Sequence, residues 1–86
     1  MMYNLYSIKD VVSGEYGYPM AIMNDNLARR TFFELGSNSK EMQDFPNDFE
    51  LWRVGTFDSQ RGTVKEQEKT FLQRGYNIKE MNKNEI

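Results

Sequence analysis

The first quarter of the chain places aromatic and aliphatic residues in two short segments that predict two strands. Residues 3–8 are rich in Tyr, Leu and Ile, which favour a pleated, half-buried strand. Gly14 and Gly17 mark a turn or an irregular loop after it, and residues 18–23 form the second segment. Pro19 lies near the start of this segment and cannot donate to a strand ladder, so we expect the second strand at a sheet edge.

Residues 26–35 have the spacing of an amphipathic helix. Asn24 or Asp25 can cap its first N–H groups, and Gly36 is a residue type favoured just past a helix end. The apolar stripe expected to face the core consists of Leu27, Ala28, Thr31, Phe32 and Leu35. The opposite side of the helix carries Arg29, Arg30, Phe33 and Glu34. We therefore expect the ring of Phe33 on the solvent side, beside the two arginines.

The middle of the chain predicts a loop, a central strand and a hairpin. Residues 37–48 are polar, acidic and rich in turn formers, so we expect a loop there. Residues 49–57 carry apolar groups on both faces, which indicates a central position in a sheet. Gly55 within this strand suggests a bulge or a close backbone approach. Residues 58–62 supply the turn of a hairpin, and a returning strand begins at residues 63–65.

The remaining residues complete a small α+β fold. Residues 66–74 are expected to form a short helix or an arm, and residues 76–86 a flexible C-terminal tail. The order β-β-α-β-β predicts a four-stranded, mainly antiparallel sheet with one helix packed on one face, in a single domain over residues 1–75. The sheet face left open by the helix would keep several aromatic rings. This indicates a dimer interface or a ligand surface.

Composition excludes several kinds of chemistry. The 86-residue chain has no His and no Cys, so it has no imidazole base, no Ser-His-Asp triad and no thiolate nucleophile or metal ligand. It contains no Gly-x-Ser-x-Gly elbow and no phosphate loop, and its acidic residues follow no metal-binding spacing. We therefore expect no enzyme activity, no catalytic residue, no metal and no cofactor.

Charge and hydropathy bear on the partner and the compartment. The net charge is -2, which argues against the large basic footprint of a duplex-DNA binder, although residues 61–86 carry a small positive excess. The longest apolar run, residues 20–23, is far shorter than the roughly 20 residues that span a bilayer. We expect a cytosolic protein without a membrane partner.

Aromatic rings are abundant, with six Phe, five Tyr and one Trp. Single-stranded nucleic acid is held by bases stacked on such rings beside a positively charged groove. The candidate nucleic-acid-binding residues are three arginines for the phosphates and three rings for the bases: Arg29, Arg30, Arg53, Phe33, Tyr6 and Trp52. The same side chains would equally suit a protein interface, so a protein partner stays open at this point.

Four segments, in order, resemble a known viral family. They are YNLYSI at 3–8, NDNLARRTF at 24–32, FPNDFEL at 45–51 and VGTFD at 54–58, with Gly62 closing the last turn. Their order and spacing resemble the small nonstructural protein of gokushoviruses, tailless phages of the Microviridae with single-stranded DNA genomes. The resemblance covers residues 3–65. It implies a protein that acts inside the infected bacterium, outside the virion, in genome replication or packaging.

Together these observations lead to one main hypothesis and two alternatives. The main hypothesis is a non-enzymatic phage protein, a homodimer, that binds single-stranded DNA in the cytoplasm of the bacterial host. The first alternative is an interaction factor that engages a phage replication or capsid-assembly protein or a host factor. The second is a metal-dependent nuclease, which would require clustering among Asp10, Asp25, Asp44, Asp48 and Asp58.

Overall fold

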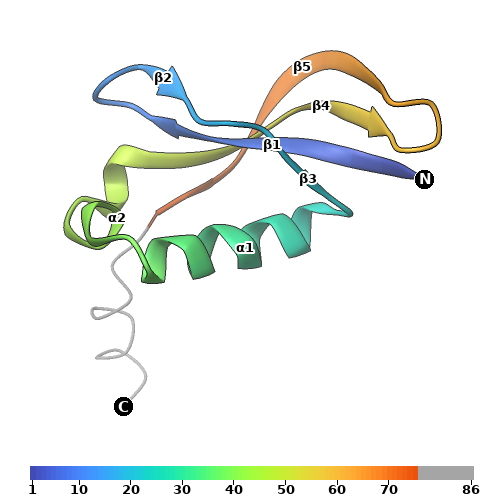
Figure 1. Ribbon diagram of the computed structural model, residues 1–86. Helices are drawn as coiled ribbons and strands as arrows, with labels where there is room; N and C mark the ends of the chain where they lie inside the picture. Colours follow the sequence, from blue (N-terminus) through green and yellow to red (C-terminus); the bar gives the residue numbers. More distant parts are fainter. Residues whose placement is uncertain (76–86) are drawn as a thin grey trace.

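The structure of the chain is a computed structural model, which describes residues 1–75. An antiparallel sheet lies above one main helix, α1, and a second, short helix follows α1 (Figure 1). The tail expected at residues 76–86 lies outside the described residues. The elements in chain order are β1 (Met2–Asp10), β2 (Glu15–Tyr16), β3 (Met20–Ile22), α1 (Asp25–Ser37), α2 (Lys40–Asp44), the 3-10 helix η1 (Pro46–Asp48), β4 (Phe49–Asp58) and β5 (Thr63–Arg74).

All strand pairings are antiparallel, and the strand order is β2-β1-β4-β5, with β3 also paired to β1. Because β4 pairs with β1 along its whole length, β2 and β3 share the other edge of β1. The second strand of the prediction corresponds to β3, which lies at an edge as expected, but it begins at Met20 and so excludes Pro19. Strand β4 occupies the predicted central position. The α+β fold with a mainly antiparallel sheet and one main helix on one face is therefore confirmed.

Strand β4 is irregular at two places, and Gly55 lies at one of them. Between Arg53 and Gly55 its register shifts against both neighbours, β1 and β5. Between Leu51 and Trp52 its register shifts against β5 again. A Cβ atom added at Gly55 would lie 2.5 Å from the carbonyl oxygen of Lys65. The predicted close approach is thus confirmed. Since bulges increase local twist, the sheet curls, and β5 arches over the rest of it (Figure 1).

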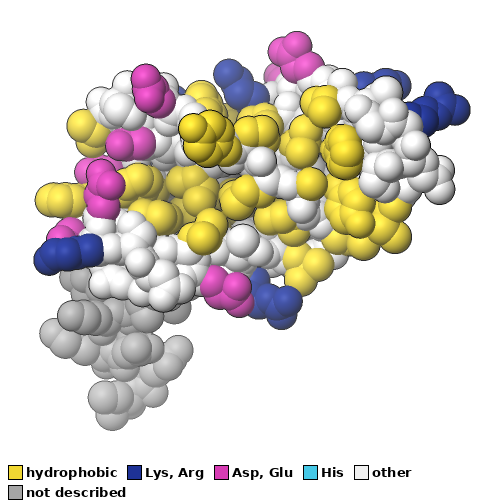
Figure 2. Space-filling model, viewed as in Figure 1, with side chains coloured by type: hydrophobic (Ala, Val, Ile, Leu, Met, Phe, Trp, Pro, Cys, Tyr) yellow, Lys and Arg dark blue, Asp and Glu magenta, His cyan; other side chains and the backbone are white. Residues whose placement is uncertain are grey.

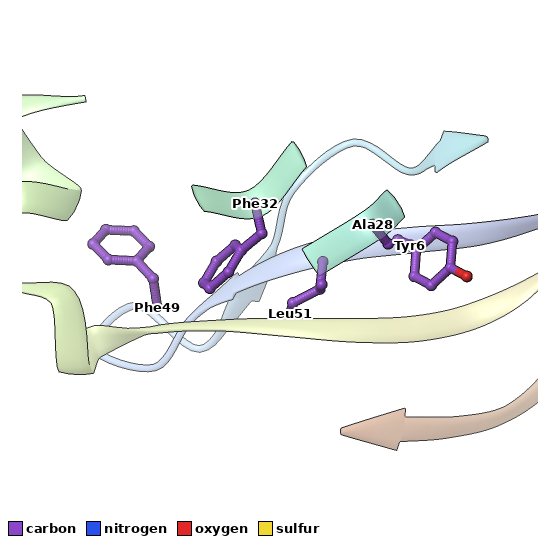
Figure 3. Close-up of a cluster of buried hydrophobic side chains, with 5 residues drawn as sticks. All are labelled: Tyr6, Ala28, Phe32, Phe49 and Leu51. Carbon is purple, nitrogen blue, oxygen red and sulfur yellow. The ribbon is translucent and has the colours of Figure 1, made fainter. Parts of the chain in front are cut away.

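The core lies between α1 and the sheet. Its buried apolar side chains are Tyr6, Ala28, Phe32, Phe49 and Leu51 (Figure 3). Of the two predicted caps, Asn24 is the one that caps α1, because its side chain accepts a hydrogen bond of 2.9 Å from the backbone N–H of Leu27. Leu35 was expected in the core stripe but is 42% exposed, so the stripe ends before the last turn of the helix.

Two predictions for the segment after the helix were wrong. Helix α1 continues through Gly36, because Asn38 caps its end with backbone and side-chain N–H groups. The loop expected at residues 37–48 contains two short helices. The first is α2, whose N-terminus Ser39 caps by accepting a hydrogen bond from the Met42 N–H, and the second is η1.

The described residues include no helix long and apolar enough to cross a membrane.

The short helix or arm expected at residues 66–74 is part of strand β5. Its Lys, Glu and Gln residues favour a helix locally. The free edge of β4 supplies backbone hydrogen-bond partners along this segment, and such tertiary pairing overrides a weak local preference. The correction matters for function, because it brings Lys69 and Phe71 onto the sheet.

Candidate nucleic-acid interface

The sheet has one face covered by α1 and one face opposite α1, called here the open face. Residues that pair directly across two strands share a face, and consecutive strand residues point to opposite faces. Arg53 pairs with Tyr6, whose side chain is buried beneath α1, whereas Trp52 pairs with Ser7. The candidate residues are therefore divided between the two faces, with Trp52 on the open one.

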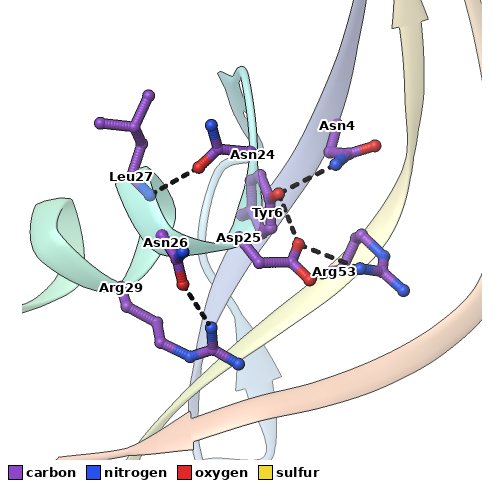
Figure 4. A network of polar contacts seen from close by, with 8 residues as sticks. All are labelled: Asn4, Tyr6, Asn24, Asp25, Asn26, Leu27, Arg29 and Arg53. Carbon is purple, nitrogen blue, oxygen red and sulfur yellow. Dashed lines mark hydrogen bonds and ion pairs between the residues drawn. The ribbon is translucent and has the colours of Figure 1, made fainter.

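On the covered face, Tyr6 belongs to a polar network at the start of α1 (Figure 4). Its hydroxyl donates a hydrogen bond of 2.7 Å to Asp25 Oδ1 and accepts one of 3.0 Å from Asn4 Nδ2. Arg53 Nη1 donates to both carboxylate oxygens of Asp25, at 3.0 and 2.7 Å. Tyr6 is 0% exposed, so its ring cannot stack on a base and its predicted role was wrong. Arg53 is held by Asp25 instead of facing a free phosphate site.

This network shifts the pKa values of its two acids. Burial, together with the hydrogen bond to the Asp25 carboxylate, raises the pKa of the Tyr6 hydroxyl to about 12. Burial alone would also raise the pKa of Asp25. The hydrogen bonds from Tyr6 and Arg53 and the charges of Arg53 and Arg29 outweigh it and hold that pKa below its ordinary value. At neutral pH the network therefore consists of a neutral tyrosine and an ionised carboxylate beside a guanidinium.

The three candidate residues of α1 have different surroundings. Arg29 donates a hydrogen bond of 3.1 Å to Asn26 Oδ1, and Arg30 is exposed. Phe33 is half-buried and packs against the core, with its ring centre 5.8 Å from that of Phe32. The expectation that the Phe33 ring faces solvent was therefore wrong. Arg29 and Arg53 line a shallow hollow of about 440 Å³, whose other walls are Asn4, Asn24, Asp25 and Asn26.

On the open face, three aromatic rings form a row across the sheet. The ring centre of Trp52 in β4 lies 6.2 Å from that of Tyr16 in β2 and 5.6 Å from that of Phe71 in β5. Both contacts are edge-to-face, with 75° between the ring planes. Tyr16 is 37% and Phe71 46% exposed. We call these three residues the aromatic row; it runs from one edge strand of the sheet to the other.

Two lysines approach the Tyr16 end of the aromatic row. Lys9 in β1 places its ammonium group 5.3 Å from the ring centre of Tyr16, and Lys69 in β5 places its own at 5.1 Å. Both distances are in the range of cation–π contacts. Within residues 1–75, neither lysine forms an ion pair with a carboxylate. In Figure 2, basic and acidic side chains both stand among hydrophobic ones along the upper side, where Figure 1 places β2 and β5.

The side chain of Glu50 fixes the position of the Trp52 indole through a hydrogen bond. Its carboxylate accepts a hydrogen bond of 3.1 Å from the indole Nε1–H of Trp52 and one of 2.9 Å from Arg74. Burial alone would raise the pKa of Glu50, but the bonds from Arg74 and Trp52 and the charges of Arg74 and Lys9 outweigh it and lower that pKa. The negative charge of Glu50 is thus already engaged by Arg74, and the indole of Trp52 is fixed in orientation.

The open face also carries an apolar group nearer the β4–β5 hairpin. Tyr3 pairs with Phe57, and Phe57 pairs with Val64, which is 66% exposed. Since β1 alternates regularly, Tyr3 shares the face of Ser7, and so this group shares the face of the aromatic row. The open face is therefore aromatic or aliphatic at both ends.

Sequence reasoning missed four residues of the open face: Tyr16, Phe71, Lys9 and Lys69. Tyr16 was assigned to a turn, and Phe71 to a helix or an arm. The usable signal was the spacing of Lys69 and Phe71, which are two residues apart and so share a face of a strand. The convergence of Lys69 on Tyr16 has no sequence signal, because it depends on how far the sheet curls.

The acidic side chains do not form a metal site in the described part of the chain. Among residues 1–75 no group of three or more His, Cys, Asp or Glu residues could hold a metal ion. Asp10 and Asp58 instead accept hydrogen bonds from backbone N–H groups of the turns that follow them. Asp25 is engaged by Tyr6 and Arg53. The clustering that a metal-dependent nuclease would require is absent from this range.

Comparison with known proteins identifies a family. No curated protein and no solved structure matches the chain. A family model described as "Phage ORF5 protein" matches residues 3–78, which includes every described strand and helix except the first residue of β1. A match of this extent shows the family. The chain therefore belongs to the Phage ORF5 protein family and is a phage protein.

Proposed function

We propose that this phage protein binds single-stranded DNA, without enzyme activity, on the open face of its sheet. The observation that carries the proposal is the aromatic row of Tyr16, Trp52 and Phe71, flanked by the ammonium groups of Lys9 and Lys69, which form no ion pair within residues 1–75. Rings on which bases stack, next to positive charges for the backbone, are the two components of sequence-independent single-strand binding. The proposal retains Trp52 from the sequence candidates and replaces Tyr6 and Phe33.

The expected affinity follows from these few contacts. Each stacked base contributes about 1–3 kcal/mol, and each neutralised phosphate makes binding more sensitive to salt. The chain is acidic overall, so little non-specific attraction adds to the local contacts. Binding by one protomer should be weak. A homodimer, in which two open faces engage one strand, would strengthen it through effective concentration.

The test uses the single tryptophan of the chain as a probe. We expect oligo-dT to quench Trp52 fluorescence at about 50 mM salt and tens of micromolar protein, and anisotropy of labelled oligo-dT to rise over the same range. Phe71→Ala should weaken binding at least about 5-fold, by loss of one stacking surface. The control is Phe45→Ala, because Phe45 is similarly exposed but lies at the end of α2. Absence of binding by the wild-type protein under these conditions would refute the proposal.

The biological setting is proposed on the resemblance to the nonstructural proteins of gokushoviruses. In that setting the protein acts in the cytoplasm of the infected bacterium, outside the virion, during genome replication or packaging. Both processes expose single-stranded genomic DNA, which is the ligand proposed for the open face. Analysis of purified virions and of infected-cell lysates with an antibody to the protein would test the location.

A second candidate function is recognition of a phage or host protein. The observation that favours it is the exposure of Val64 and Phe71 on the open face, since exposed apolar side chains on one surface are common at protein interfaces. A partner recovered from infected cells in stoichiometric amount after nuclease treatment, together with no oligonucleotide binding, would support this function over DNA binding.

A further inference from the structure

Lys69 and Tyr16 lie on strands at opposite edges of the sheet, yet their side chains meet on the open face. In the strand order β2-β1-β4-β5, Tyr16 lies in the first strand and Lys69 in the last. Two strands lie between them, so in a flat sheet their backbones would be three spacings of about 4.8 Å apart. The ammonium nitrogen of Lys69 nevertheless lies 5.1 Å from the ring centre of Tyr16, which the curl of the sheet (Figure 1) and the length of the lysine side chain together allow. Lys9 reaches the same ring from the adjacent strand β1.

Two like charges on one ring require an explanation. Lys9 and Lys69 each bring a positive charge to the Tyr16 ring, and neither forms an ion pair with a carboxylate of residues 1–75. Glu50 pairs with Lys9 in register and the charge of Lys9 acts on its carboxylate, but the hydrogen bonds of that carboxylate come from Arg74 and the Trp52 indole. An anion that reaches both ammonium groups would offset the two like charges and gain charge-assisted hydrogen bonds.

The chemistry of the surroundings indicates which anion fits. The two ammonium groups stand at one end of the aromatic row, so an anion held there lies beside a surface on which bases can stack. A nucleic-acid strand carries a phosphate next to each base, which matches this juxtaposition. We propose that Lys9 and Lys69 form a clamp for one backbone phosphate of single-stranded DNA at the Tyr16 end of the row.

This inference rests on the proposed function and makes it more specific. With a phosphate held at Tyr16, successive bases would stack toward Trp52 and then Phe71, so the strand crosses the sheet from the β2 edge to the β5 edge. The two lysines then act together, because both contact the same phosphate. Neutralising either lysine should weaken the same phosphate contact. Neutralising both should therefore reduce the affinity for DNA little more than neutralising one.

The experiment compares salt dependence among three charge-neutralising variants. Lys9→Gln and Lys69→Gln should each reduce the slope of log affinity against log salt by about 0.7 to 1, and the double variant should add little more. The matched control is Lys65→Gln, which removes the same charge from the same strand. Lys65 pairs with Thr56, which pairs with Asn4 of the covered face, so its side chain points away from the row.

The possible outcomes separate this inference from the proposed function. If wild-type protein binds oligo-dT, Lys9→Gln and Lys69→Gln each reduce the salt slope and the double variant adds little more, the clamp is supported. If the two reductions add, the lysines contact different phosphates and the clamp is refuted. If wild-type protein binds but these variants keep the slope of Lys65→Gln, the clamp is refuted while DNA binding stands. If wild-type protein does not bind, both ideas fail. Circular dichroism of each variant confirms that the fold is retained.

Discussion

The hydroxyl of Tyr6 donates a hydrogen bond of 2.7 Å to Asp25, which ties the middle of β1 to the first turn of α1. Arg53 of β4 binds the same carboxylate from the other side. Three elements that are distant in sequence thus meet at one side chain. The side chains of Tyr6 and Arg53, which the sequence offered as DNA contacts, hold the helix on the sheet instead.

The first prediction concerns this tie. Tyr6→Phe keeps the buried ring but removes the hydroxyl, so Asp25 retains only Arg53 as a partner. The free energy of unfolding should fall by about 1–2 kcal/mol, measured by urea denaturation. Tyr18→Phe is the control, because Tyr18 is 95% exposed and should change nothing. A Tyr6→Phe protein as stable as the wild type would show that the hydrogen bond does not hold the helix.

The second prediction concerns alkaline pH. The pKa of Tyr6 is raised from 10.0 to about 12, so the folded state binds the phenolic proton more tightly than the unfolded state does. Stability from this group is complete below about pH 10 and is lost as the pH rises toward 12. The difference in unfolding free energy between wild type and Tyr6→Phe should therefore shrink over that range. A constant difference would contradict the raised pKa.

The third prediction concerns acid. Folding lowers the pKa values of Asp25 and Glu50 from their ordinary values of 3.8 and 4.5. The two ionised carboxylates therefore contribute fully to the free energy of unfolding above these ordinary values, and the contribution is lost as the pH falls through the lowered pKa values. Asp25→Asn combined with Glu50→Gln should be less stable than wild type at pH 7 and lose less stability between about pH 5 and 2. Equal acid sensitivity of the two proteins would exclude these carboxylates as its source.

Local pattern was enough to predict several elements. The pair Asn24 and Asp25 predicts a helix cap, because such a side-chain oxygen can accept from a free N–H whatever the rest of the fold does, and Asn24 is the cap. Residues 49–57 predict a central strand because apolar groups occupy both faces. Glycine within that strand predicts a bulge or a close backbone approach, and Gly55 makes the close approach. Each of these features is decided by the residue itself or its immediate neighbours.

The candidate site could not be predicted in the same way, since it depends on long-range geometry. Tyr6 was a plausible stacking ring until α1 was placed over its face of the sheet. Residues 66–74 have a helical composition, and only the free edge of β4 makes them a strand. The meeting of Lys69 with Tyr16 requires that strand and the curl of the sheet together. Neither the strand at residues 66–74 nor the curl of the sheet can be inferred from the residues next to Lys69 or Tyr16.

The fourth prediction concerns the anchor of Trp52. Glu50→Ala removes the acceptor of the indole N–H and the partner of Arg74, so the free energy of unfolding should fall by about 1–3 kcal/mol. Glu50→Gln retains an acceptor oxygen and should cost less. Fluorescence reports the site directly, because Trp52 is the one tryptophan of the chain. We expect a shifted emission maximum for Glu50→Ala and little shift for Glu50→Gln; identical spectra for both would argue against the anchor.

The fifth prediction compares two glycines whose surroundings differ, Gly55 in β4 and Gly36 in α1. A Cβ atom at Gly55 would lie 2.5 Å from the carbonyl oxygen of Lys65, and this backbone cannot move without breaking the β4–β5 pairing. Gly55→Ala should therefore lower the free energy of unfolding by about 1–3 kcal/mol.

Gly36 gives the opposite expectation. A Cβ atom at Gly36, within α1, would lie 3.6 Å from Met42 Cε, an ordinary contact. Gly36→Ala should stabilise the protein by up to about 1 kcal/mol, because alanine restricts the unfolded chain. Urea denaturation of both variants checks the opposite signs. If Gly55→Ala were neutral, β5 would have to lie farther from β4 there, and the curl that brings Lys69 to Tyr16 would lose its physical basis.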